Sequence, residues 1–146
     1  MQQNQQNTNA FLIHISAFMG FIVPFGHIIA PLIAWQTLKD RSSFLDKQGK
    51  EALNFNMSYT LYSFFLSATF IPLAFNIFFN NFDTFTNADN FHFNFDFNPT
   101  LIVGFIGIAI LLSILHLVGI TLVIIASLKA KKEENYTYPF TIKFIK

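Results

Sequence analysis

The residues of this chain that could do chemistry are few. No pair among the four histidines, His14, His27, His92 and His116, has the spacing of metal ligands. The sequence has no Gly-rich phosphate loop, no His-Glu-x-x-His motif and no nucleophile–base pattern. It contains no cysteine, which excludes disulfides, thiolate metal sites and a cysteine nucleophile. We therefore predict no catalytic residue, no metal site and no cofactor, and we expect that the protein is not an enzyme.

One group of polar residues does share a side of a predicted helix. Lys47, Glu51, Asn54, Ser58 and Tyr62 follow one another at steps of four, three, four and four. Two interpretations fit this stripe. The polar side chains could hydrogen-bond to neighbouring helices in a membrane, or they could line a polar path for a substrate or peptide.

The stripe begins in the densest block of mixed charge, residues 43–58. Ser43 and Asp46 match the pattern that caps a helix start, and Asp46 also suits the positive end of a helix. Lys50 and Glu51 complete the charged part, and an apolar segment follows directly. This block predicts a helix that begins in water and then enters a membrane.

Composition supports a membrane protein. The chain of 146 residues is 53% hydrophobic and 12% charged, whereas about 25% of a typical soluble domain is charged. Residues 1–38, 52–82 and 97–128 carry no charge, and each of these stretches holds an apolar segment long enough to cross a bilayer, about 20 residues. The chain is therefore predicted to be a multi-pass protein of the cytoplasmic membrane, with the lipid bilayer as its surroundings. A net charge of +1 implies no attraction to nucleic acid.

The first apolar segment, residues 10–38, is interrupted by Pro24 and Gly26 and again by Pro31. Proline and glycine this close together break or kink a helix. The residues alone leave two alternatives open: a single kinked span, or a hairpin of two short helices at about 10–23 and 27–38. Trp35 lies just before a charged turn, where an interfacial aromatic residue is expected.

Two longer spans are predicted at about 46–79 and 100–130, within a helical transmembrane domain of residues 10–130. The loop 80–98 between them has aspartates but no Lys or Arg. Phenylalanines alternate along part of this loop, which is the period of a strand, so the segment could rest on the membrane interface or dock a partner. Residues 1–9 are predicted to be a disordered polar tail, and residues 131–146 a cytoplasmic tail on the membrane surface.

The distribution of positive charge predicts the orientation. Lys and Arg occur at residues 39–50 and 129–146 and are absent from the loop 80–98. The positive-inside rule places the first two regions in the cytoplasm. With a hairpin at residues 10–38, both termini would be cytoplasmic.

Two polar residues are predicted at similar depth near the middle of the bilayer. Tyr62 lies about 16 Å of helix rise from Glu51, and His116 lies about 20 Å from Lys129. Because hydrocarbon offers no water, each needs a protein partner. We predict that the Tyr62 hydroxyl and the His116 ring face each other, directly or through Ser113 or one water molecule.

Three stretches resemble a known family: residues 14–20 with 24–35, residues 44–55, and residues 138–145. They are similar to small bacterial membrane proteins of unknown function classed as Tic-twenty-like, which are related to a chloroplast inner-envelope protein-import component. One departure is His27, where an asparagine would be expected. The resemblance implies an all-α fold with a short N-terminal helical hairpin and two long antiparallel transmembrane helices, but it implies no reaction.

Two functions compete on this basis. The chain could be a non-enzymatic subunit or assembly partner of a membrane complex, binding another protein or copies of itself. Alternatively, it could form a small oligomeric transporter or channel, with translocation suggested by analogy with the plastid relatives. The broken first segment and the polar stripe favour the second, and the lack of catalytic patterns beside helix-packing signals favours the first.

Overall fold

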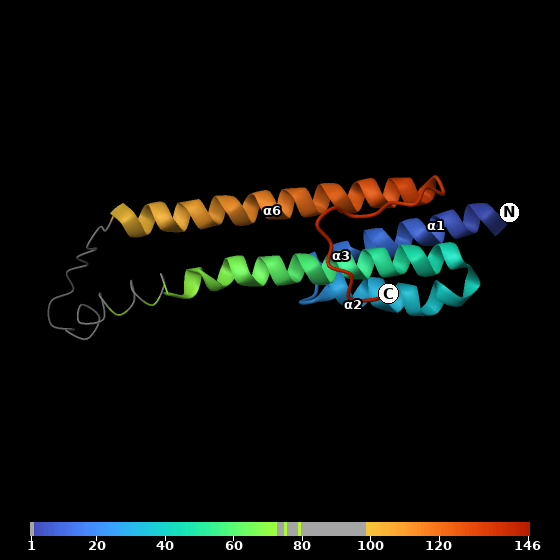
Figure 1. The fold of residues 1–146 in the computed structure, drawn as a ribbon, viewed down its shortest axis with the longest axis horizontal. Coiled ribbons are helices and arrows are strands. Elements are labelled where there is room, and N and C mark those ends of the chain that lie inside the picture. The colour runs from blue at the N-terminus through green and yellow to red at the C-terminus, as the bar shows by residue number, and fades with distance from the viewer. Residues whose placement is uncertain (1, 73–74, 76–78, 80–98) are drawn as a thin grey trace. The chain divides into compact units, whose positions relative to one another are not determined.

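The computed structural model describes residues 2–72, 75, 79 and 99–146, and these residues contain helices and no β-strand (Figure 1). In chain order the elements are α1 (Gln2–Ile15), the 3₁₀ helix η1 (Ser16–Phe21), α2 (Gly26–Leu38), the 3₁₀ helix η2 (Lys39–Arg41), α3 (Ser43–Ala68) and α6 (Pro99–Lys131). The predicted all-α class is thus confirmed for the described part. The predicted loop 80–98 lies outside it.

The chain divides into two compact units. The first contains Met1–Leu61 and Leu117–Lys146, and the second contains Tyr62–His116. The first unit therefore holds the N-terminal helices, the beginning of α3, the end of α6 and the C-terminal tail. The sequence motifs discussed above lie mostly in this unit.

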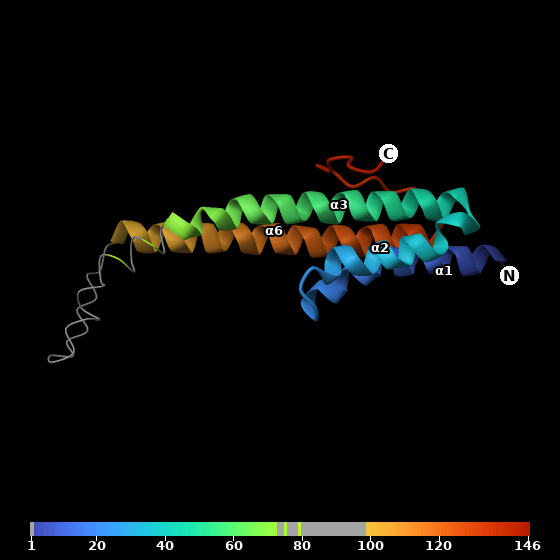
Figure 2. The ribbon, with the colours of Figure 1, turned by 90° about the horizontal axis from the view of Figure 1, so that it is seen from below.

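The first two helices form a hairpin, in which α1 and α2 lie side by side and run in opposite directions (Figure 2). At the turn, Phe25 adopts a left-handed conformation with φ 59°. The next residue must be glycine because a Cβ on Gly26 would overlap the backbone carbonyl of Met19. Of the two alternatives for residues 10–38, the structure has the hairpin.

The N-terminal tail differs from the sequence prediction. Residues 2–9 are helical, as the first turns of α1, rather than disordered. The hydrophobic positions Ala10 and Ile13 are fully buried, and the Gln3 amide donates a hydrogen bond of 2.6 Å to Glu133. Burial of the apolar side of α1 thus extends the helix into its polar beginning.

Helix α3 begins one residue away from the predicted cap. Ser42, not Ser43, is the N-cap: its backbone is extended, and its hydroxyl accepts a 3.2 Å hydrogen bond from the Leu45 amide. Asp46 makes other contacts instead, described below. The helix ends at Ala68, residues 70–72, 75 and 79 are helical as well, and the predicted continuation of the span to residue 79 stays a prediction.

Helix α6 is the only helix among the described residues that is long and apolar enough, by length and composition, to cross a membrane. Only 11% of its most apolar window is buried, so its hydrophobic surface is available to lipid or to other helices. A second long transmembrane helix stays a prediction.

At the end of α6 the chain reverses direction within the first unit. The Glu134 amide bonds to the Lys129 carbonyl and the Glu133 amide to the Ala130 carbonyl, and Glu133 is left-handed with φ 65°. This is a Schellman motif, in which glycine is the usual residue at the left-handed position. The C-terminal tail begins at this turn, and its Tyr138 is buried in the first unit.

Two clusters of buried residues form the core of the first unit. One joins α1, α3 and the end of α6 through Ala10, Ile13, Leu45, Ala52 and Ala130. The other consists of Ala17, Phe55, Val123, Ala126 and Tyr138.

The second unit is described by its helical segments alone. Within it, the Phe70 and Phe105 rings lie 5.3 Å apart between centroids. Large apolar side chains such as Phe64, Phe65 and Val103 are exposed.

Candidate functional site: a polar cluster closed by the C-terminal tail

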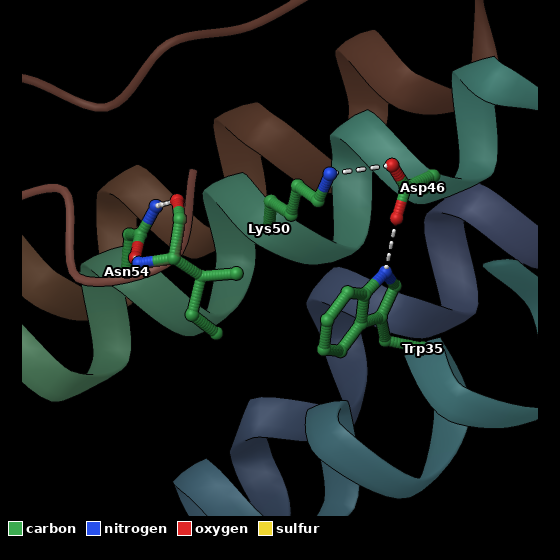
Figure 3. Close-up of polar contacts among 5 residues, drawn as sticks. Trp35, Asp46, Lys50 and Asn54 are labelled. Atoms are coloured by element: carbon green, nitrogen blue, oxygen red, sulfur yellow. Dashed lines mark hydrogen bonds and ion pairs between the residues drawn. The ribbon is translucent and has the colours of Figure 1, made fainter.

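The middle of the polar stripe on α3 binds the backbone of the C-terminal tail. The Asn54 amide (Figure 3) donates a 2.9 Å hydrogen bond to the Ile145 carbonyl, and its oxygen accepts hydrogen bonds of 3.0 and 2.8 Å from the Phe144 and Ile145 amides. One turn further on, the Ser58 hydroxyl accepts a 2.8 Å hydrogen bond from the Ile142 amide and donates to the Asn54 carbonyl at 2.7 Å. Both side chains are buried. They satisfy backbone groups that a sheet would otherwise satisfy.

The tail also contributes Tyr138 to a buried polar network. Its hydroxyl lies 2.9 Å from Nδ1 of His14, and Nε2 of His14 lies 2.7 Å from Oε1 of Gln48. A carbonyl oxygen can only accept, so Nε2 carries the proton and donates to Gln48. Burial favours the neutral ring, whose Nδ1 then accepts the Tyr138 proton. The Tyr138 ring stacks on Phe55 with centroids 4.1 Å apart.

Glu51 lies close enough to influence Tyr138. Burial, Tyr136 and then Glu51 hold the pKa of the Tyr138 hydroxyl well above its usual value. The Glu51 side chain is buried, and its Oε2 atom has no hydrogen-bond partner among the described residues. The same holds for Nε2 of Gln48, one turn earlier on α3. One acceptor and one donor therefore lie near the network with unmet hydrogen-bonding capacity.

Asp46 joins α3 to the end of α2. Its two oxygens contact the Trp35 indole N–H at 2.9 Å and the Lys50 ammonium at 2.7 Å (Figure 3). The hydrogen bond from Lys50, with a further one from Trp35, lowers the pKa of the Asp46 carboxyl. Gly49 is required here because a Cβ at this position would overlap the Trp35 ring. The Lys39 ammonium lies over the Trp35 ring, 5.4 Å from the ring centroid.

The predicted stripe thus divides into three parts. Lys47 is exposed at one end; Glu51, Asn54 and Ser58 are buried in the first unit; and Tyr62 is exposed and belongs to the second unit. The middle three are the part that contacts the tail or lies near it.

The predicted contact between Tyr62 and His116 stays a prediction. The His116 Nδ1–H donates to the Leu112 carbonyl at 2.8 Å, so Nε2 of a neutral ring is an acceptor suited to a tyrosine hydroxyl. Ser113 donates to the Ala109 carbonyl of its own helix at 2.8 Å.

Sequence reasoning did not identify Gln48 and Tyr138 as residues of this site, and it assigned no role to His14. The signal for Gln48 was present, since a buried amide three residues before Glu51 lies on the same side of α3. The pairing of His14 with Tyr138 spans 124 positions, and no local pattern reports so distant a contact. Among the described residues, no group of three or more metal-ligating side chains occurs.

Comparison with known proteins corrects the family assignment. The model of the magnetosome magnetite crystal formation protein family (MamF/MmsF) matches residues 5–145, nearly the whole chain. The Tic-twenty-like resemblance is therefore wrong as an assignment, and the residues that carried it fall within this other family. No curated protein and no solved structure matches the chain.

Proposed function

Because this chain belongs to the magnetosome magnetite crystal formation protein family, a family of magnetosome membrane proteins, we propose that it is a multi-pass subunit or assembly partner in the magnetosome membrane. In this role it catalyses no reaction itself. It supports crystal formation by binding other membrane proteins or copies of itself.

The observation that carries this proposal is that polar side chains are buried in the first unit while large apolar side chains of α6 are exposed. His14, Gln48, Asn54 and Ser58 are buried and bind other parts of the first unit. Helix α6 instead directs large apolar side chains outwards. In a bilayer such a surface contacts lipid or packs against another helix. The exposed apolar surface of α6 thus suits association within a membrane.

Photo-crosslinking along α6 tests this association. A photoreactive amino acid at Leu117, which is 64% exposed, should crosslink to a protein in native membranes. The photoreactive amino acid placed instead at Ile114 or at Leu128, which are also exposed, shows how far the contact extends along α6. Ala126, which is fully buried, serves as the internal control and should crosslink only within the chain. Crosslinks to lipid alone at every exposed position would argue against a protein partner.

The proposed topology has the N-terminus, residues 39–50 and the C-terminus in the cytoplasm, because positive charge gathers in these regions. Single cysteines at Asn9, Ser42, Asp89 and Asn135 can be labelled selectively from either side, since the chain has no native cysteine. In cells whose cytoplasmic membrane contains the protein, we expect labelling from outside at Asp89 alone. Labelling at Asn135 would reverse the whole orientation.

A second proposal is transport by an oligomer, favoured by the unpartnered polar atoms of Gln48 and Glu51 in the interior of the first unit. Such groups cost free energy unless something binds them, and intramembrane ionisable residues often mark transport paths. Reconstituted vesicles should then pass ions or small solutes, and Glu51→Gln should reduce the flux. Vesicles that pass neither, with the protein inserted, would leave assembly as the function.

A further inference from the structure

The two ends of the α1–α2 hairpin differ sharply in polarity. At one end, Gln3 bonds to Glu133 and Lys39 lies over Trp35. At the other end, the turn exposes large apolar side chains: Phe21 is 69% and Ile22 is 75% exposed. The exposed residues of this hairpin tip are Met19, Phe21, Ile22, Val23 and Phe25. The tip therefore presents apolar side chains to its surroundings.

The depth of the tip can be measured along α3. His27, in the first turn of α2, donates a 2.7 Å hydrogen bond to the Thr60 hydroxyl. Thr60 lies ten residues beyond Lys50, which is about 15 Å of helix rise. The hydrocarbon core of a bilayer is about 30 Å thick. With Lys50 at the headgroups, the tip therefore reaches about the middle of the bilayer.

The backbone of the tip is suited to lipid. The amides of Ile22 and Val23 both bond to the Met19 carbonyl, at 3.0 and 2.9 Å, and the Gly26 amide bonds to Val23 at 2.9 Å. Pro24 has no amide proton to satisfy. A turn at membrane depth is tolerated only where its polar groups are satisfied by the protein. Because these bonds satisfy the amides of the turn, the tip can lie among acyl chains.

From this geometry we propose that the hairpin occupies one leaflet only, the one on the side of the Lys39–Arg41 turn, with acyl chains around its tip. The two helices of the hairpin, α1 and α2, then take up space in that leaflet and none in the opposite leaflet. It favours membranes in which this leaflet is convex, as the outer leaflet of a small vesicle is. Recognition of membrane curvature is thus a further activity of this chain, separate from its association with other proteins.

Depth is tested first, with spin labels. The absence of native cysteine lets a single Phe21→Cys carry one nitroxide, and its high exposure means that the label displaces little. Collisions with oxygen should dominate over collisions with a water-soluble nickel chelate at this position. The matched control is Asp40→Cys, at the polar end, where the chelate should dominate. A label at residue 21 that meets the chelate as readily as the one at residue 40 would overturn the proposal.

Curvature is tested with membrane tubes pulled outwards from giant vesicles that contain the protein labelled at Asp40→Cys. A soluble quencher reports the orientation of each population. Protein with its residue 40 outside should be enriched in the tube, and protein in the opposite orientation should be depleted. Ile22→Asp with Val23→Asp, which makes the tip polar, should abolish both effects. Equal distribution in both orientations, with residue 21 shown to lie deep, would refute curvature recognition while leaving the proposed assembly role untouched.

Discussion

Replacing Asn54 with alanine should release the end of the C-terminal tail, from Phe144 onwards, from α3 while the helices stay folded. The Asn54 side chain makes three hydrogen bonds to the backbone of Phe144 and Ile145, and alanine makes none of them. The side chains of the tail near this point contribute little, because Phe144 is half exposed and Phe140 is almost fully exposed. Asn54 is therefore the main link between this part of the tail and the helix.

The size of the effect follows from the number of bonds. A hydrogen bond contributes about 1 kcal/mol net to stability, so three contribute about 3 kcal/mol. Each 1.4 kcal/mol is a factor of ten in an equilibrium constant, which makes opening of the tail about 150-fold more frequent in Asn54→Ala. Amide exchange at Phe144 and Ile145 should accelerate by about the same factor.

Hydrogen exchange read by mass spectrometry on C-terminal peptides measures this change. The matched control is Asn56→Ala: Asn56 is also buried on α3, but its amide donates to the Ala52 carbonyl of its own helix. Asn54→Asp keeps the acceptor and loses the donor, so its effect should lie between the two. If Asn54→Ala and Asn56→Ala change exchange in the tail equally, the tail is held by something other than Asn54.

Three further predictions concern the helices. Gly49→Ala should push the single tryptophan of the chain out of its site, which would lower thermal stability and shift tryptophan fluorescence to longer wavelength; an unshifted spectrum would contradict the close contact. Ser42→Ala should cost about 1 kcal/mol as the loss of an N-cap, measured by melting in detergent, whereas Ser43→Ala should cost much less; the reverse order would restore the cap predicted from the sequence. A double-mutant cycle of Tyr62→Phe and His116→Leu should show a coupling of about 0.6–2 kcal/mol, and simple additivity would refute their contact.

The hairpin shows how far the sequence could be read. Pro24 and Gly26 predicted a break in the first helical segment, and the structure has a turn there. The residue that adopts the left-handed backbone, however, is Phe25, while Gly26 is needed for space beside Met19. Sequence patterns locate a turn because Pro fixes its own φ and Gly adopts backbone angles that other residues avoid, but which residue does which in the turn depends on the packing of two helices.

The polar stripe shows where sequence reasoning ended. The spacing of Glu51, Asn54 and Ser58 places them on one side of α3, and the structure has them there, buried. Their partner could not be predicted, since Asn54 and Ser58 bind tail backbone groups, which every residue type carries alike. The cap of α3 was misplaced by one residue because Ser42 and Ser43 are adjacent and the Asp46 carboxylate, expected to support the cap, instead pairs with Trp35 and Lys50.

The contact between His14 and Tyr138 constrains how the protein can be made. The two residues are 124 positions apart, and a ribosome adding about 5–20 residues per second needs about 6–25 s to reach the second after the first. During that interval the His14 ring lacks the Tyr138 hydroxyl as its partner. The N-terminal helices can form early, but their contact with the tail forms only after Tyr138 has been synthesised. A chain terminated before residue 138 would lack this contact between the tail and α1.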